Sequence, residues 1–101
     1  MAIENTSRAT IEQNFANIRR VIESRIYDEL NPLLAEQRVL IGSLPFADPE
    51  AQAYFAQVQD LTAWSLTMLR MQRSALEQSL AAVVRLRQIE EYQLYSAAPT
   101  E

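Results

Sequence analysis

The 101-residue chain contains no cysteine, no histidine and no lysine. Without cysteine it cannot form a disulfide, offer a thiolate nucleophile or bind a metal through sulfur. Without histidine, it also lacks the usual zinc ligand and the base of Ser/His or Cys/His catalytic pairs. Carboxylates alone could still bind a metal, but no spacing in the sequence indicates such a site. We therefore expect no metal and no other cofactor.

The acidic pairs of the chain do not indicate an enzyme either. Asp28 and Glu29 are adjacent, as are Glu90 and Glu91, and adjacent residues diverge around a helix. An acid and a base that work on one substrate have to converge on the same atoms. The sequence thus predicts a protein without enzymatic activity.

All nine basic residues are arginines, and thirteen acidic residues outnumber them, which gives a formal net charge of -4. Nucleic-acid binding needs a surplus of positive charge on some face, so this balance argues against it. Only residues 70–87 carry a local excess of positive charge, with four arginines against the single acid Glu77. They form either a solvated helix face or a patch for an acidic partner.

Long apolar runs are also missing. Residues 61–69 form an uncharged stretch that is far shorter than the roughly 20 residues of a membrane-spanning helix. The first eight residues have no apolar segment of the kind found in a signal peptide. We therefore expect a cytoplasmic protein that does not insert into a membrane.

Glycine and proline, which punctuate helices, are scarce and clustered. The only glycine, Gly42, opens a segment that also contains Pro45 and Pro49, so residues 42–48 are expected to be an inter-helix loop. Asp48 is a suitable N-cap, with Pro49 at the first helical position. Since no glycine or proline follows until residue 99, one long helix is predicted from Pro49 to about Ser96.

The N-terminal half also has a helical pattern. Thr10 and Gln13 have the spacing of a capping box, although the helix could begin earlier, at Thr6 or Ser7. Asn31-Pro32 interrupts the pattern, as a kink or as the start of a new helix, and the unbroken phase of the apolar residues favours the kink. The apolar stripe comprises Ile11, Phe15, Ile18, Ile22, Ile26, Leu30, Leu33, Leu40 and Leu44.

These elements predict an all-α fold. The first helix, kinked or broken at Asn31-Pro32, packs against the long second helix in an elongated antiparallel hairpin or a small bundle. Residues 1–101 form a single domain, and residues 1–9 and 97–101 are expected to fray.

The long helix carries two apolar lines, displaced around its axis by roughly 100° to 140°. The first line is expected to pack against the first helix and comprises Phe55, Val58, Leu69, Leu76, Leu80 and Val83. The second line comprises Leu61, Trp64, Met68, Met71, Ala75, Ala82, Leu86 and Ile89, with Tyr92 beyond its end. A single neighbouring helix cannot cover both lines, so a partner is indicated.

The second line runs through positions 61, 64, 68, 71 and 75 and then 82, 86 and 89. This nearly regular alternation of steps of three and four resembles a coiled-coil seam. Trp64, Met68 and Met71 give its middle the adaptable, aromatic composition found where a groove receives a helix. The same line could instead be internal core, if the segments before and after Pro32 pack on different sides of the long helix. A third possibility is a seam between two copies of the chain.

Two stretches resemble the FliT/FlgN class of flagellar type III export chaperones, which are small, acidic, all-helical proteins. Residues 30–44 are similar to the class pattern of helically spaced leucines that flank an acid and an arginine ahead of a loop. Residues 76–92 resemble its closing pattern of a leucine-rich helix, a Leu/Arg cluster and a terminal tyrosine. Together they cover about a third of the chain.

The resemblance implies a chaperone or adaptor that binds a helical segment of an export substrate, or a component of the export apparatus. The alternative function is that of a self-associating structural protein, a homodimer without a client. The predicted partner-binding residues are Leu61, Trp64, Met68, Met71, Ala75, Leu86, Ile89 and Tyr92.

Overall fold

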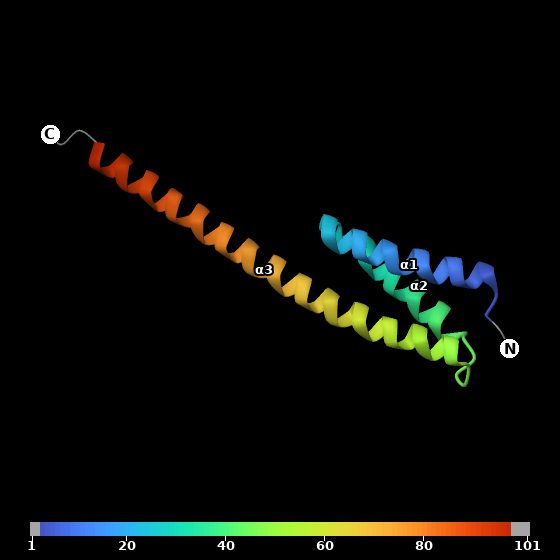
Figure 1. Ribbon diagram of the computed structural model, residues 1–101. Helices are drawn as coiled ribbons and strands as arrows, with labels where there is room; N and C mark the ends of the chain where they lie inside the picture. Colours follow the sequence, from blue (N-terminus) through green and yellow to red (C-terminus); the bar gives the residue numbers. More distant parts are fainter. Residues whose placement is uncertain (1–2, 98–101) are drawn as a thin grey trace. The chain divides into compact units, whose positions relative to one another are not determined.

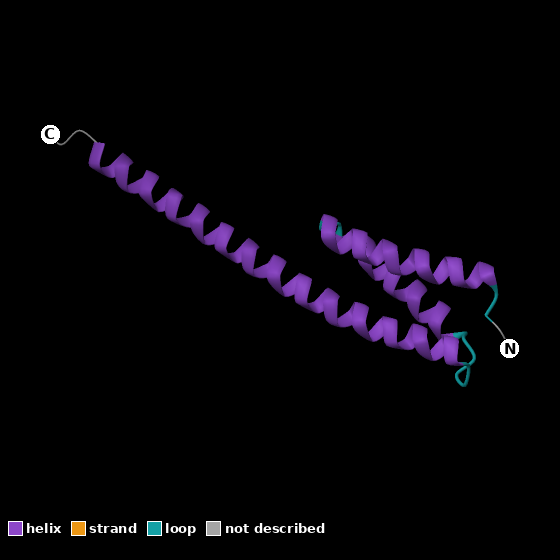
Figure 2. Cartoon of the chain, viewed as in Figure 1, coloured by secondary structure: helices purple, strands orange, loops and turns teal. Residues whose placement is uncertain are grey.

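The computed structural model describes residues 3–97, and every regular element in that range is helical. Helix α1 (Asn5–Ser24) is followed by the short 3-10 turn η1 (Tyr27–Glu29), α2 (Leu30–Gly42) and α3 (Pro49–Ala97) (Figures 1 and 2). The predicted all-α fold, with an interrupted first helix and one long second helix, is confirmed.

The chain divides into two units, Met1–Leu69 and Arg70–Glu101, and α3 contributes residues to both. The tail expected to fray lies outside the described residues, except for Ala97 at the end of α3. No helix within residues 3–97 combines the length and the apolarity needed to cross a membrane.

The first unit is a small three-helix bundle. Helices α1 and α2 lie side by side and run in opposite directions (Figure 1), and the first part of α3 packs on the same core. The rings of Phe15 in α1 and Tyr54 in α3 meet edge to face, with their centroids 6.4 Å apart. The most deeply buried apolar side chains are Ile11, Ile18, Val21, Ile22, Ala51 and Leu61.

Helix α1 ends at a left-handed residue that is not glycine. Arg25 has φ 61° and ψ 33°, and its N–H donates to the carbonyl of Ile22. The N–H of Ile26 donates to the carbonyl of Val21 at 3.0 Å, which completes a Schellman motif. Because this motif turns the chain away from the α1 axis, the next helix can fold back along α1.

The interruption of the first helix therefore lies a few residues ahead of Asn31-Pro32. Both residues are in the first turn of α2, which begins at Leu30. A proline is harmless there, because the first four N–H groups of a helix have no carbonyl partner within it. Asn31 is inside the helix and does not cap it.

The N-terminal residues are more ordered than their sequence suggested. Helix α1 begins at Asn5, and the preceding Ile3 is 6 % exposed within the core. Thr10 lies inside the helix, where its hydroxyl donates to the carbonyl of Thr6 at 2.8 Å. The early start follows from Ile3, whose burial adds an apolar anchor before the first turn.

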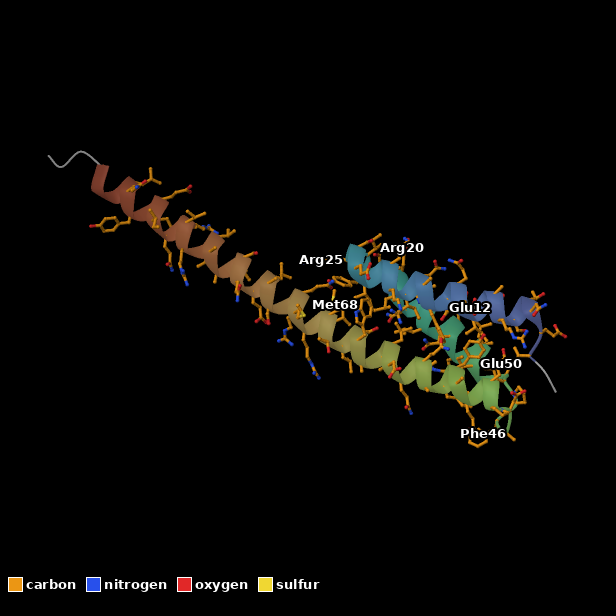
Figure 3. The ribbon with its side chains drawn as sticks, viewed as in Figure 1. Glu12, Arg20, Arg25, Phe46, Glu50 and Met68 are labelled. Atoms are coloured by element: carbon orange, nitrogen blue, oxygen red, sulfur yellow. The ribbon has the colours of Figure 1, made fainter. Side chains whose placement is uncertain are left out.

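The α2–α3 loop ends as predicted. The Oδ1 atom of Asp48 accepts a hydrogen bond from the backbone N–H of Glu50 at 2.8 Å, so Asp48 is the N-cap of α3. Phe46 stands in this loop (Figure 3), and its ring lies 6.0 Å from that of Phe55 on α3.

One buried polar side chain joins α1 to α2. Asn14 is 1 % exposed, and its Nδ2 atom donates to the carbonyl of Leu33 and to Oε1 of Glu36, both at 3.0 Å. Only the donor half of this buried amide is satisfied, because its buried Oδ1 atom has no hydrogen-bond partner. The two bonds from Nδ2 fix the position of α2 along α1.

An ion pair links the start of α1 to the start of α3. The guanidinium of Arg8 donates to both carboxylate oxygens of Glu50, including a 2.8 Å bond from Nη2 to Oε2. This hydrogen bonding lowers the pKa of Glu50 and raises that of Arg8. The pair joins segments that are 42 residues apart in the sequence.

Replacing Arg25 by glycine should stabilise the protein. A non-glycine residue in the left-handed region is strained, because its Cβ approaches the following carbonyl oxygen. Glycine has no Cβ and adopts this conformation without that clash. We expect R25G to raise the free energy of unfolding by roughly 0.5 to 1 kcal/mol, measured by urea denaturation. The matched change R20G, in the regular part of α1, should lower the free energy of unfolding. Equal effects of the two changes would show that Arg25 is not in a strained left-handed conformation.

Removing the charge of Glu50 should destabilise the protein only where the carboxylate is ionised. Its pKa is lower in the folded than in the unfolded chain, so the stabilisation is complete above the unfolded pKa. It is lost as the pH falls through the folded pKa. At pH 7 we expect E50Q to have a lower melting temperature than the unchanged protein. In acid the two melting temperatures, measured by circular dichroism, should converge. The exposed Glu23 supplies the control E23Q, which makes the same substitution outside this ion pair and should melt at the same temperature as the unchanged protein at pH 7.

Candidate functional site

Large apolar side chains are exposed along the part of α3 that belongs to the second unit. Nine of the fifteen exposed large apolar residues found among the described side chains lie there. They are Met71, Leu76, Leu80, Val83, Val84, Leu86, Ile89, Tyr92 and Leu94. Scattered apolar residues are ordinary on a protein surface, but a concentration of this kind marks an interaction site.

The beginning of the second apolar line lies in the bundle of the first unit. Leu61 is 2 % exposed and is part of the core, so it has no free surface to offer a partner. Trp64 and Met68 are half-buried and pack against that core; Figure 3 labels Met68 on α3. The guanidinium carbon of Arg19 lies 5.6 Å from the centre of the Trp64 ring, in a cation–π arrangement. Three of the eight predicted residues therefore contribute to internal packing.

The other five predicted residues are exposed on the second unit. Met71 is 62 % exposed, and Ala75, Leu86, Ile89 and Tyr92 are exposed as well. Met71 and Ala75 are four residues apart, and Leu86, Ile89 and Tyr92 follow one another at steps of three. Both groups lie on one strip of α3, with Gln78 and Ala82 between them. We call this strip the second-line face.

The first line was expected to be covered by the first helix along its whole length, and for its second half this expectation is wrong. Phe55, Val58 and Leu69 pack against the core of the first unit. Leu76, Leu80 and Val83 are 66 %, 62 % and 59 % exposed. We call these three residues, which the sequence had assigned to internal packing, the first-line face.

The physical reason is the turn at Arg25. A straight first helix from Thr10 to Ile41 would extend for nearly 50 Å at 1.5 Å per residue. The turn divides it into α1 and α2, of 20 and 13 residues, which lie side by side instead of end to end. The sequence indicates this turn only weakly. Arg25 is not a glycine, and the helical spacing of the apolar residues continues unchanged on both sides of it.

A cavity of about 150 Å³ lies between the three helices of the first unit. Its apolar lining includes Ile18 and Ile22 of α1, Leu30 and Leu34 of α2, and Leu66 and Leu69 of α3. Pockets for small organic ligands usually measure 300 to 1,000 Å³. The cavity is therefore too small for a typical cofactor or metabolite, although a single apolar side chain could enter it.

Four charged residues of the second unit form two ion pairs along the helix. The Nε atom of Arg73 lies 2.9 Å from Oε1 of Glu77, and that of Arg87 lies 3.6 Å from Oε1 of Glu91. Both pairs join residues i and i+4 and are largely exposed, so each adds only a few tenths of a kcal/mol. The exposed apolar residues are therefore bordered by exposed charges, a chemistry suited to binding another protein.

Truncating Leu61 should be far more costly than truncating Met71. Leu61 fills the core, so L61A should lower the free energy of unfolding by roughly 2 to 5 kcal/mol. Met71 is exposed, and M71A should change it by no more than about 0.5 kcal/mol. Urea denaturation followed by Trp64 fluorescence measures both values, and a large loss for M71A would show that Met71 belongs to the core.

Comparison of the chain with protein-family models, with curated proteins and with solved structures finds no match.

Proposed function

We propose that the protein is a non-enzymatic chaperone or adaptor that binds a helical segment of another protein on the second-line face of α3. The observation that carries this proposal is the exposure of Met71, Leu86, Ile89 and Tyr92 on one strip of a regular helix. Water contact with this much clustered apolar surface is unfavourable, and a partner that covers it gains the free energy of burial.

A helix is the partner best suited to this strip. Leu86, Ile89 and Tyr92 recur at steps of three on the side of α3 that also carries Met71 and Ala75. Such rows accept the ridge of a second helix. Methionine is flexible and adapts to different partners, while a tyrosine combines a large apolar ring with a hydroxyl that can stay in water. The strip therefore suits an amphipathic helix that presents its own apolar face.

The resemblance to the flagellar export chaperones supplies the class of partner. In this proposal the client is a flagellar or type III export substrate with an aggregation-prone helical end, or a component of the export apparatus. Binding in the cytoplasm would keep that helical end from assembling before export.

Replacing the exposed apolar residues by glutamine should abolish partner binding and leave the fold intact. The variant M71Q/L86Q/I89Q/Y92Q removes the apolar surface while retaining good helix formers, so its circular dichroism should match that of the unchanged protein. Both proteins, tagged, are used to capture partners from an extract of the native cells, and the captured proteins are identified by mass spectrometry. We expect secreted or filament proteins with the unchanged chain and their loss with the variant.

The control makes the same kind of change on the first-line face, in the variant L76Q/L80Q, and should capture the same partners as the unchanged chain. Recovery of the chain alone would count against the proposal, and so would a set of partners that the quadruple variant retains. A drop in helicity of the quadruple variant would mean instead that these residues stabilise the fold.

A further inference from the structure

The first-line face extends into a longer seam that contains charges at fixed intervals. Taken in steps of three and four along α3, the seam comprises Arg73, Leu76, Leu80, Val83, Arg87 and Glu90. All six side chains are exposed. We propose that this seam pairs with the same seam of a second copy of the chain, in an antiparallel two-helix coiled coil.

The charges of the seam exclude a parallel pair. In a parallel pair each residue faces its own counterpart, so Arg73 would face Arg73, Arg87 would face Arg87 and Glu90 would face Glu90. Like charges held in one layer repel, and such layers disfavour the partner arrangement that creates them.

An antiparallel pair has a two-fold axis midway between Leu80 and Val83. Residues equally far from that point then face each other across the two copies. Leu80 faces Val83 of the second copy, which forms a central apolar layer in duplicate. Seven residues farther out on each side, Arg73 faces Glu90 of the second copy. The one acidic residue of the seam is thus placed opposite an arginine.

The flanking charges fit the same register. Arg70 of one copy and Glu91 of the second copy border the seam on the same side. Their positions along the dimer axis differ by about 3 Å, or two residues. The stem of Arg87 packs on Leu76 of the second copy, and its guanidinium is within about one residue of the height of Glu77 there. Three arginines and three glutamates are therefore matched. Arg85, the remaining charge of this stretch, is opposite to the seam on α3.

The pairing requires little rearrangement within each copy. The ion pairs Arg73–Glu77 and Arg87–Glu91 are largely exposed, so exchanging them for pairs between copies costs little. The inference goes beyond the client-binding function and does not rest on it, because the dimer uses the first-line face. Met71, Ile89 and Tyr92 of the second-line face are outside the seam and stay free for a client.

Charge reversal on the full chain tests the register. We expect sedimentation equilibrium to show that the unchanged protein forms a dimer. In R73E the dissociation constant of this dimer should rise about tenfold or more, because two glutamates then face each other in each of two layers. E90R should weaken the dimer similarly. The double variant R73E/E90R restores both opposite-charge layers and should dimerise as the unchanged chain does. R85E makes the same charge change away from the seam and should have no effect.

Orientation is measured independently with a spin label. Since the chain has no native cysteine, S74C carries a single label on the exposed side of α3. The antiparallel register separates the two labels by 15 residues, or about 22 Å along the axis, whereas a parallel pair would place them at the same height. Electron–electron distance measurement therefore distinguishes the two.

A monomer at every concentration, a dimer that R73E leaves unchanged, or labels at the same height would each overturn the inference. None of these results bears on capture of a client by the second-line face. Conversely, loss of client binding in the M71Q/L86Q/I89Q/Y92Q variant with dimerisation unchanged would show that the two faces act separately.

Discussion

The left-handed turn at Arg25 is the constraint on which the rest of the structure depends. Because two backbone hydrogen bonds close this turn, α1 and α2 fold side by side and build a three-helix bundle with the first part of α3. A straight N-terminal helix would have used the same apolar residues along one side of α3. The turn concentrates them in the first unit, where Ile18, Ile22 and Leu61 are almost fully buried.

The consequence for function is the apolar surface on α3 after Leu69. A helix with large exposed apolar residues gains stability when a second surface covers them, and two faces are available for this. The second-line face ends in Ile89 and Tyr92 with Arg85 beside them. The first-line face continues into Arg73 at one end and into Arg87 and Glu90 at the other. This difference in chemistry separates a face suited to varied helical clients from a face that matches its own copy.

Polar contacts in the first unit specify how the bundle is assembled. The buried amide of Asn14 bonds to α2, while the Arg8–Glu50 pair ties the start of α1 to the start of α3. Apolar packing alone tolerates sliding of one helix along another, because leucine and isoleucine contacts are not directional. Hydrogen bonds at fixed positions remove that freedom, so they set which parts of α3 are covered.

The sequence by itself determined the helical elements, the loop at residues 42–48, the cap at Asp48 and the unbroken α3, because each has a local chemical signal. It also indicated that α3 carries more apolar surface than one helix can cover. Only the tertiary structure decided which residues are covered: Leu61 is core, while Leu76, Leu80 and Val83, assigned to core by their periodicity, are exposed. The reason is that periodicity reports the face of a helix on which a residue lies, whereas burial depends on how far the neighbouring helices extend. How far α1 and α2 extend along α3 depends on the turn at Arg25. Nothing in the sequence indicates that this arginine adopts a left-handed conformation.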